Sequence, residues 1–279
     1  MRVIESCAEC LYDKQAHLTD DKGYLEEVRK ILKERGENDS APYLVYLFHQ
    51  LYEKKFGKKP SYREIKKKYN DLVLSMVPTL RERIETSKVP LRTAFVFARI
   101  GNYIDFGAMN HVDEAVFLNL FDDLTMREKD EEVFDSFLEQ CRHASRFLLI
   151  ADNCGEIVLD RLFLEQIKKQ FPQMDFTVMV REGEALNDVT REDAEYVGID
   201  SMARIVTNGL PMTGAAYDLL PKDARQAVDE ADIILSKGQG NYEAFSRQGR
   251  RAFYSFLCKC ELFTERFQVP KLTGVFVEE

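Results

Sequence analysis

Two oxygen-bearing side chains, Asp152 and Asn153, stand directly after the apolar run at residues 147–151. The run is typical of a buried strand in a parallel sheet, and the stretch after Gly155 has the periodicity of a helix. Ligands bind at the carboxyl ends of strands in open α/β sheets, and a helix N-terminus favours an anion. A carboxylate beside a carboxamide also suits a hard divalent cation. Capping of the helix by Asp152 or Asn153 explains the same pattern equally well.

Polar residues also follow two later strand-like runs. Asn187 and Asp188 come a few residues after the run at 175–182, where a turn or a helix cap is the ordinary interpretation. Lys237 lies among glycines in the sequence SKGQGN, residues 236–241, directly after another apolar run. Glycines let the backbone approach a ligand, and the lysine offers a point charge to phosphate. The spacing matches neither the Walker loop nor the GxGxxG dinucleotide fingerprint.

Asn102 and Asp105 are three residues apart in an apolar stretch, for which the pattern predicts a helix over residues 91–106. At this spacing both side chains lie on one helix face. Polar side chains inside an apolar helix are costly unless they are hydrogen-bonded or face a cleft. We therefore expect either a buried hydrogen-bonded pair or, if this face meets the carboxyl edge of the sheet, contacts with substrate hydroxyl groups.

Six cysteines include two close pairs, Cys7 with Cys10 and Cys258 with Cys260. Four thiols could hold zinc, although a pair spaced by one residue is unusual for that metal. Cys7 and Cys10 could instead form a redox pair, and Cys258 could be a small buried hydrophobe in a strand. The four histidines are scattered, so we expect no histidine-based metal site.

The sequence pattern changes near residues 140–145. Earlier residues are helix-patterned; among them Ser61 starts a capping-box pattern that predicts a helix through Val77, which Pro78 is expected to break or restart. Later residues alternate apolar strand-like runs with amphipathic helices, which is typical of βα units. We therefore predict an α/β fold with a Rossmann-like, largely parallel sheet, preceded by an all-helical domain. The predicted domains are residues 1–143 and residues 144–279.

Bulk properties limit the partners. The chain has 279 residues and a formal net charge of −9, with both signs interspersed, which disfavours a nucleic-acid partner. No segment approaches the roughly 20 consecutive apolar residues of a membrane span, and the first residues lack a signal-peptide core. We expect a cytoplasmic protein without a membrane partner; the sequence does not predict its oligomeric state.

Five motifs occur together in one order along the chain. They are CAEC at 7–10, GNYID at 101–105, ADNCGE at 151–156, NDVT at 187–190 and KGQGNYE at 237–243. In these motifs the chain resembles the damage-control phosphatases, a metal-binding family first catalogued as a domain of unknown function. The amino-terminal Cys-x-x-Cys pair resembles the prokaryotic branch of that family. The resemblance implies a helical domain packed on a Rossmann-like domain, with the site between them.

The resemblance also implies roles for individual residues. Asp152, Asn153 and Asp188 match the ligands of one divalent metal, for which manganese, cobalt, nickel or magnesium is expected. Lys237 matches the residue that contacts phosphate. The other residues expected at the substrate are Asn102, Asp105, Asn241 in the glycine loop, and Glu156 beside the metal pair.

The implied activity is hydrolysis of phosphate monoesters of small metabolites, such as sugar phosphates or damaged phosphometabolites, with Asp152 and Lys237 as catalytic residues. The attacking group is a metal-bound water or Asp152 itself, through an aspartyl phosphate, and ligation of Asp152 to the metal favours water. One alternative is an S-adenosylmethionine-dependent carboxyl methyltransferase, although the turn DNCGE lacks the glycine-rich loop expected there. Another is a non-catalytic phosphometabolite-binding protein, whose site would look the same.

Overall fold

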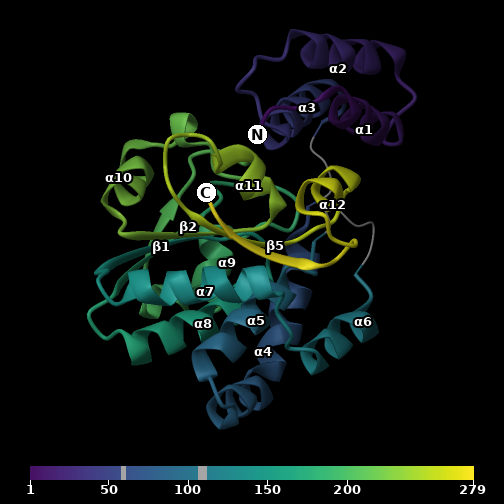
Figure 1. Ribbon diagram of the computed structural model, residues 1–279. Coiled ribbons are helices and arrows are strands. Elements are labelled where there is room, and N and C mark those ends of the chain that lie inside the picture. Colours follow the sequence, from purple (N-terminus) through teal and green to yellow (C-terminus); the bar gives the residue numbers. More distant parts are fainter. Residues whose placement is uncertain (58–60, 106–111) are drawn as a thin grey trace.

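The computed structural model describes residues 1–57, 61–105 and 112–279, and its strands form one six-stranded sheet (Figure 1). The strand order is β3-β2-β1-β4-β5-β6, with β6 antiparallel to β5 and all other neighbours parallel. The predicted α/β fold with a largely parallel sheet is therefore confirmed. The strands are β1 (Arg146–Ile150), β2 (Asp175–Val180), β3 (Arg204–Thr207), β4 (Ile233–Lys237), β5 (Phe253–Leu257) and β6 (Gly274–Glu278).

The two central strands, β1 and β4, mark a topological switch point. β2 and β3 extend the sheet on one side of β1, and β4 to β6 extend it on the other side. Ligands of open α/β sheets bind in the crevice at the carboxyl ends of such strands. The residues that follow Ile150 in β1 and those at and after Lys237 in β4 lie at this position.

Helices cover both faces of the sheet (Figure 1). The side chains of β1 alternate between two cores: Phe147 and Leu149 face one, and Leu148 and Ile150 face the other. The first core contains α4 (Arg63–Thr86), α5 (Pro90–Gly101), α7 (Glu128–Cys141) and α8 (Glu156–Gln170). The second contains α10 (Lys222–Glu230), α11 (Gln239–Phe245) and α12 (Glu261–Phe267). The remaining short elements are α6 (Glu114–Asn119), α9 (Arg191–Tyr196) and the 3-10 turns Leu120–Asp122, Ile199–Ser201 and Tyr217–Leu219.

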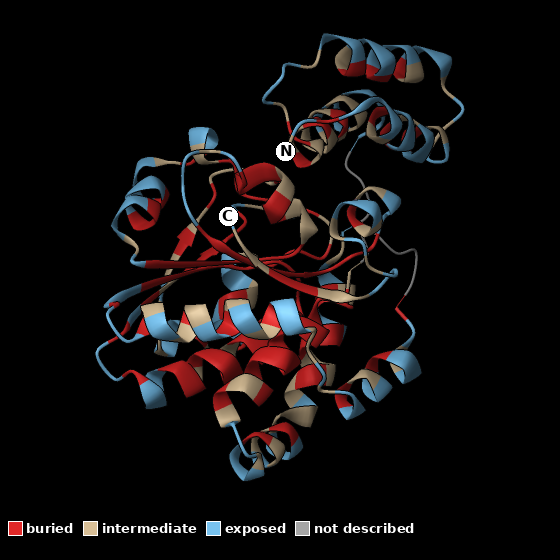
Figure 2. Ribbon diagram, in the orientation of Figure 1, coloured by how far each residue is buried: buried red, intermediate tan, exposed pale blue. Residues whose placement is uncertain are grey.

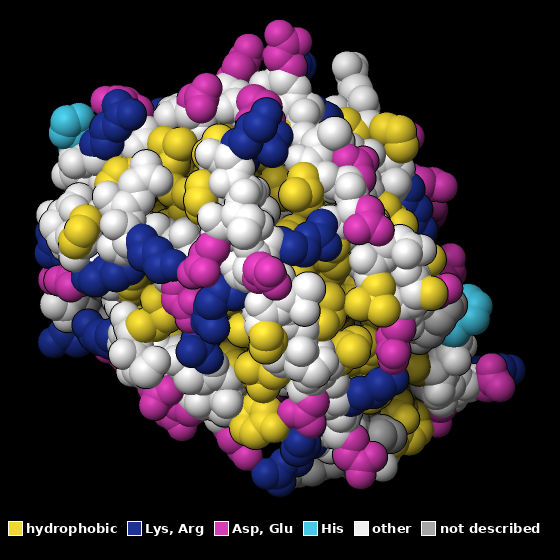
Figure 3. Space-filling model, turned by 90° about the horizontal axis from the view of Figure 1, so that it is seen from below, with side chains coloured by type: hydrophobic (Ala, Val, Ile, Leu, Met, Phe, Trp, Pro, Cys, Tyr) yellow, Lys and Arg dark blue, Asp and Glu magenta, His cyan; other side chains and the backbone are white. Residues whose placement is uncertain are grey.

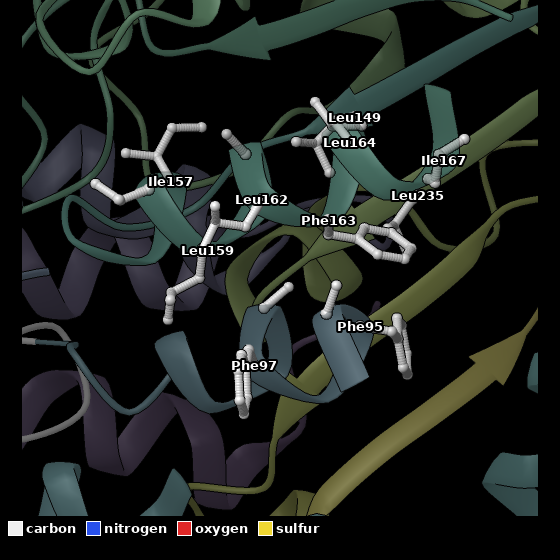
Figure 4. Packing of buried hydrophobic residues seen from close by; sticks show 14 of the residues in the cluster. Phe95, Phe97, Leu149, Ile157, Leu159, Leu162, Phe163, Leu164, Ile167 and Leu235 are labelled. Carbon is white, nitrogen blue, oxygen red and sulfur yellow. The ribbon is translucent and has the colours of Figure 1, made fainter. Parts of the chain in front are cut away.

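Helix α5 is buried along nearly its whole length and packs against α8 (Figure 4). Phe95 of α5 meets Phe163 of α8 with ring centroids 5.5 Å apart. Burial of one such side chain stabilises the fold by about 2–3 kcal/mol. At the end of α5, a Cβ on Gly101 would lie 2.9 Å from Cα of Glu156, so glycine permits the close approach of the two helices. This approach sets the next residue, Asn102, against the first turn of α8.

The first three helices, α1 (Glu5–Ala16), α2 (Lys22–Glu34) and α3 (Ala41–Phe56), form a unit with its own apolar core. Their inner faces are buried and their outer faces are exposed (Figure 2). The unit contacts the α/β part through α3, where Tyr43 and Tyr46 pack against Met212 and Ala244. Helices α4, α5 and α7 instead share the main core with the sheet, so packing across residue 143 is continuous. The division of the chain at that residue stays a prediction.

Two sequence-based expectations for α4 are wrong. The helix runs through Pro78 without a break, because proline removes only one hydrogen bond and the apolar residues on either side, including Leu80, remain buried in the core. The capping box at Ser61 does not form. Its hydroxyl accepts a hydrogen bond from the N–H of Arg63 and donates one to Glu184, so it ties α4 to the loop after β2.

Acidic and basic side chains are interspersed on the surface seen from below (Figure 3). Neither sign forms one continuous field on this face, which agrees with the mixed charge pattern of the sequence. Within the described ranges, no helix combines the length and apolar character needed to cross a membrane.

Candidate active site

The turn after β1 and the loop after β2 lie side by side at the switch point. The N–H of Cys154 donates to the carbonyl of Asn187 over 2.9 Å, and the N–H of Val189 donates to the carbonyl of Asp152 over 2.8 Å. Asn153 and Asp188 form an isolated antiparallel bridge. The main chain thus brings together the three residues that were predicted to share one metal ion.

The carboxylates of Asp152 and Asp188 are both almost fully buried, with 7% and 4% of each residue exposed. Burial raises the pKa of Asp152 well above its ordinary value, and the charge of Asp188 raises it further. Burial also raises the pKa of Asp188 to about 6. Two carboxylates that disfavour each other's charge in a buried place create a strong preference for a cation.

The guanidinium of Arg181, which follows directly after β2, lies between these carboxylates. Its Nε donates to Oδ2 of Asp188 over 2.7 Å, and its Nη2 lies 3.5 Å from Oδ1 of Asp152. Arg181 is fully buried. It was not predicted from the sequence, although its position after an apolar strand is the signal that identified Asp152.

Neither Asp152 nor Asn153 caps helix α8. The N–H of Gly155 at the helix start donates to Oδ1 of Asn70 in α4 over 2.6 Å. Gly155 has φ of +83°, a left-handed conformation that glycine adopts without strain. Because a side chain from α4 satisfies this N–H, the oxygens of Asp152 and Asn153 are left for the site, and this N–H is not available to phosphate.

The Asn70→Ala variant should lower the free energy of unfolding by about 1–2 kcal/mol, because it leaves the buried N–H of Gly155 without an acceptor. Urea denaturation followed by circular dichroism measures this change. The control is Asn119→Ala, which removes an exposed asparagine from α6 and should change stability by less than about 0.5 kcal/mol. Equal effects of the two substitutions would contradict the capping role.

Asn102 connects the helical layer to the acidic cluster. Its Nδ2 donates to Oδ2 of Asp152 over 3.0 Å and to Oε2 of Glu156 over 3.1 Å, and its Oδ1 accepts from the N–H of Leu257. The amide nitrogen of Asn153 contacts the same two carboxylates, at 2.7 and 3.0 Å. Asn102 and Glu156 are fully buried, so the structure places them beneath the site and not at an open surface.

The predicted helix over residues 91–106 is too long. Helix α5 ends at Gly101; Asn102 follows as the C-cap and Asp105 lies beyond the turn at residues 102–103, so the two do not share a helix face. Phe106 lies outside the described residues. Asp105 is part of the outer side of the site, where its side chain is 18% exposed and its Oδ2 lies 2.6 Å from Nζ of Lys259.

Lys259, another residue missed in the sequence, follows strand β5 at the same edge of the sheet. Its backbone N–H is held by the side chain of Gln239, which belongs to the glycine loop after β4. Its ammonium is paired with Asp105, which also acts electrostatically on Asp152 and Asp188. The position of Lys259 after an apolar strand was a signal that could have identified it. The neighbouring Cys258 and Cys260 instead favoured an interpretation of this segment as thiol ligands.

Lys237 is buried under the cluster. Its Nζ lies 2.5 Å from Oδ1 of Asp160, 2.7 Å from Oε1 of Glu156 and 3.0 Å from the carbonyl oxygen of Ala98. Burial alone would lower its pKa, but the two carboxylates hold the pKa of Lys237 above its ordinary value. The ammonium group thus has two hydrogen bonds and one further ion pair within the protein. In the structure Lys237 is the counter-ion of two buried carboxylates. Its contact with phosphate stays a prediction.

The glycine loop begins at Gly238, whose backbone touches the acidic cluster. Gly238 has φ of +80°, and a Cβ there would lie 1.9 Å from Oδ2 of Asp152. Asn241 holds the loop to the sheet, because its Nδ2 donates to the carbonyls of Ala151 and Lys237 over 3.0 and 2.7 Å. The carbonyl oxygen of the Asn241 side chain is buried without a hydrogen-bond partner.

The Gly238→Ala variant should lose at least about 100-fold in metal-dependent activity and should bind metal more weakly, because the new methyl group must displace the Asp152 carboxylate. Steady-state kinetics and manganese titration measure both effects. The matched control is Gly249→Ala. Gly249 also has a positive φ, of +73°, but a Cβ there meets nothing within 4 Å, so that variant should keep its activity. Similar activity of the two variants would contradict this prediction.

The donor set fits a divalent cation. Asp152 and Asp188 supply carboxylate oxygens, and the side-chain amide of Asn153 supplies a third oxygen donor, which is the chemistry that hard cations prefer. The raised pKa values of both carboxyl groups show that these buried charges lack full compensation from the protein. Within the described part of the chain, no group of three or more His, Cys, Asp and Glu side chains is arranged to hold a metal. A metal bound by the two carboxylates would therefore take Asn153 as a third ligand, and this set of ligands stays a prediction.

The cysteines are all free thiols. Cys258 is buried in the second core, as expected for a small hydrophobe, and burial raises the pKa of its thiol to about 12. Cys10 and Cys260 are exposed. These thiols form no metal-binding group with other His, Cys, Asp or Glu side chains among the residues that the structure describes, so a four-thiol zinc site has no support there.

Two hollows on the surface lie away from the acidic cluster. One, of about 320 Å³, is lined by residues of α4 and of the segment from α6 to Phe121. The other, of about 190 Å³, lies between α4 and α8 beside Pro78. Neither is lined by a residue of the candidate site, so the site is defined here by its polar contacts.

Comparison with known proteins gives consistent results over nearly the whole chain. The family model described as the damage-control phosphatase ARMT1-like domain matches residues 2–273. A damage-control phosphatase of Archaeoglobus fulgidus is 30% identical over 276 residues, which cover 94% of this chain and 93% of that protein. A damage-control phosphatase of Pyrococcus horikoshii is 26% identical over 286 residues, covering 97% and 96% of the two chains.

A solved structure shows the same fold. The crystal structure of a DUF89-family protein from Pyrococcus horikoshii superimposes with a TM-score of 0.77, at 24% identity, and covers 99% of this chain and 98% of its own. The fold, the site at the switch point and the match of the family model over residues 2–273 lead to one assignment. This chain belongs to the family of damage-control phosphatases with an ARMT1-like domain.

Proposed function

We propose that the protein is a divalent-metal-dependent phosphatase that hydrolyses phosphate monoesters of small metabolites. The observation that carries this proposal is the convergence of Asp152, Asn153 and Asp188 at the switch point of the sheet. Relatives that span nearly the same length are named damage-control phosphatases. Because the acidic side chains are almost fully buried, the phosphorylated group must be small enough to enter, which favours a metabolite over a macromolecule.

Asp152, Asn153 and Asp188 would hold one divalent ion, for which manganese, cobalt, nickel and magnesium are the candidates. When bound, the ion supplies positive charge that offsets the negative charge of the phosphoryl group and activates a nucleophile. The residues beneath the ion fix its ligands in place. Asn102 does so by donating to Oδ2 of Asp152, and Glu156 accepts hydrogen bonds from Asn102 and Asn153.

Asp152 serves better as a ligand than as the nucleophile. Its Oδ2 accepts hydrogen bonds from Asn102 and Asn153 and lies against Gly238, and its Oδ1 faces Arg181. An aspartyl-phosphate mechanism would require one of these oxygens to leave its contacts and approach phosphorus in line. We therefore favour attack by water, for which Asp152 and Asp188 provide the negative charge that retains the cation.

Lys259 is the lysine that we assign to the outer, substrate side of the site. The side chains of both lysines are buried, but Lys259 is paired with Asp105, whose side chain is 18% exposed, whereas Lys237 lies between the fully buried Asp160 and Glu156. A hydroxyl group of the substrate could contact the partly exposed carboxylate of Asp105, and Lys259 would hold that carboxylate in place. In this proposal Lys237 supports the site indirectly, by holding Glu156 against Asn102 and Asn153.

The test is an assay of protein stripped with a chelator, on p-nitrophenyl phosphate and on a panel of sugar phosphates. Activity should be absent after stripping and should return with manganese, cobalt, nickel or magnesium. No hydrolysis with any of these metals would contradict the proposal. If phosphate compounds stabilise the protein against heat without any turnover, the protein binds phosphometabolites without catalysis.

A further inference from the structure

Arg181 occupies a position that its contacts do not explain. Its main chain is fixed, because its N–H donates to the carbonyl of Val189 over 2.8 Å and it forms a parallel bridge with Thr190. The side chain is 0% exposed and reaches the point where Asp152 and Asp188 meet. The local fold therefore holds a permanent positive charge inside the acidic cluster.

Only one of the three guanidinium nitrogens has a hydrogen bond. Nε donates to Asp188, whereas Nη1 and Nη2 are buried without a hydrogen-bond partner; the 3.5 Å separation of Nη2 from Asp152 is an ion pair and not a hydrogen bond. In the described ranges of the chain, these are the only buried side-chain nitrogens that lack a partner. Other buried cations differ: Lys237 donates to Asp160 and to the carbonyl of Ala98, and Arg99 donates to Asp130 and to the carbonyl of Thr125.

Buried N–H groups without acceptors are costly, and those of a charged group cost more than those of a neutral one. Such unpaired donors beside an active site favour binding of a ligand that supplies acceptors, because the new hydrogen bonds remove the energetic cost. The planar guanidinium edge formed by Nη1 and Nη2 matches two oxygens of a phosphate group. A phosphate monoester offers these oxygens when its phosphoryl group reaches the acidic cluster.

We propose that Arg181 is a phosphate-binding residue, whose Nη1 and Nη2 donate to oxygens of the phosphoryl group of a small phosphate monoester or of the phosphate product. This inference deepens the proposed function and rests on it. A metal held by Asp152, Asn153 and Asp188 would supply positive charge at the phosphoryl group, and Arg181 would orient that group by a two-pronged hydrogen bond.

The experiment compares the wild type with Arg181→Lys and Arg181→Gln by isothermal titration. Manganese is titrated first; inorganic phosphate is then titrated both with saturating manganese and without metal. Both variants should bind manganese within about threefold of the wild type and lose at least about tenfold in phosphate affinity, because neither offers the guanidinium fork. Phosphate affinity within about threefold of the wild type would overturn the proposal.

An equal loss of manganese and phosphate affinity would also overturn it, because Arg181 would then only position the metal ligands. Arg99→Lys is the matched control: it replaces a buried arginine outside the site and should leave phosphate affinity unchanged. If the wild type binds phosphate but no metal, the metal-dependent function fails while the role of Arg181 is still decided by the metal-free titrations. If the wild type binds neither, both proposals fail.

A measurement on the wild type covers the case in which an Arg181 variant does not fold. A crystal structure with magnesium and orthovanadate, a phosphate analogue, should place at least one vanadate oxygen within hydrogen-bond distance, about 3.2 Å, of Nη1 or Nη2. A bound vanadate that contacts the metal site and leaves both nitrogens without an oxygen neighbour would show that the inference is wrong.

Discussion

The Asp152→Asn variant should keep its fold and lose at least about 10³-fold in metal-dependent kcat/KM, which corresponds to roughly 4 kcal/mol of transition-state stabilisation. The substitution keeps the size of the side chain and an oxygen that can accept from Asn102 and Asn153. It removes one of the two carboxylate charges that would retain the ion. Kinetics on p-nitrophenyl phosphate with added manganese measure the loss.

Stability separates this effect from misfolding. Burial disfavours the charged form of Asp152, so the neutral asparagine should leave the melting temperature of the metal-free protein unchanged or higher. Addition of manganese should raise the melting temperature of the wild type and not that of the variant. Asp175→Asn is the control, since Asp175 is exposed at the opposite end of β2 and its loss should change neither activity nor metal response. Hydrolysis by Asp152→Asn at the wild-type rate would contradict the ligand assignment.

The sheet could be predicted because its signals are local. Most of the strands are short apolar runs that end at glycine or polar residues, and the two-sided burial of β4 and β5 explains why their runs are continuous. The order of the strands is set by packing between distant segments and is not encoded in any single run. For that reason the sequence predicted a parallel sheet but not that β1 and β4 are the neighbours at the switch point.

The ends of elements were harder to predict, because tertiary contacts decide them. The apolar periodicity of α5 continues past Gly101, yet the helix stops where its last residues meet the first turn of α8. Helix α4 shows the opposite case: its apolar face stays packed through Pro78, although the local signal predicts a break. In both helices, packing against residues far away in the sequence determines whether the helix ends or continues.

The candidate site also combines residues with a local sequence signal and contacts that depend on distant residues. Asp152, Asn153 and Asp188 each follow an apolar strand, but a helix cap or a turn explains each of them alone equally well. The order of the five motifs, and the family resemblance that they carry, identified the three residues together. The cap on α8 could not be foreseen, because it comes from Asn70, 85 residues earlier in the chain. Lys237 carried the strongest local signal for phosphate, but its environment depends on Asp160 and Glu156, whose side chains reach it from α8.

The second large effect is expected on stability, when the enclosed Lys237 is replaced. The Lys237→Met variant should lower the free energy of unfolding by about 3–5 kcal/mol at pH 8, because it removes the counter-ion of two buried carboxylates and keeps the volume of the side chain. The added substitution Asp160→Asn should recover part of this loss, since one of the two uncompensated charges is then removed. Chemical denaturation of the wild type, the single variant and the double variant measures both changes.

The cost should also depend on pH. Burial raises the pKa of Asp160 from 3.8 to about 7, while the charge of Lys237 opposes the rise. A carboxyl group whose pKa is raised on folding contributes stability that is fully present below its unfolded pKa, near 3.8, and that is lost as pH rises through about 7. Without Lys237 the pKa rises further, so the loss extends to higher pH. The deficit of Lys237→Met relative to the wild type should therefore be smaller at pH 6 than at pH 8.

Lys66→Met is the matched control for this prediction. Lys66 is also buried, but it neutralises one carboxylate, that of Asp193, which is 16% exposed and keeps its hydrogen bonds to Thr190. Its loss should cost less than half as much as the loss of Lys237, because Asp193 can still be hydrated. If Lys237→Met were as stable as the wild type at pH 8, Lys237 would not be a structural counter-ion, and direct contact with phosphate would again be its best explanation.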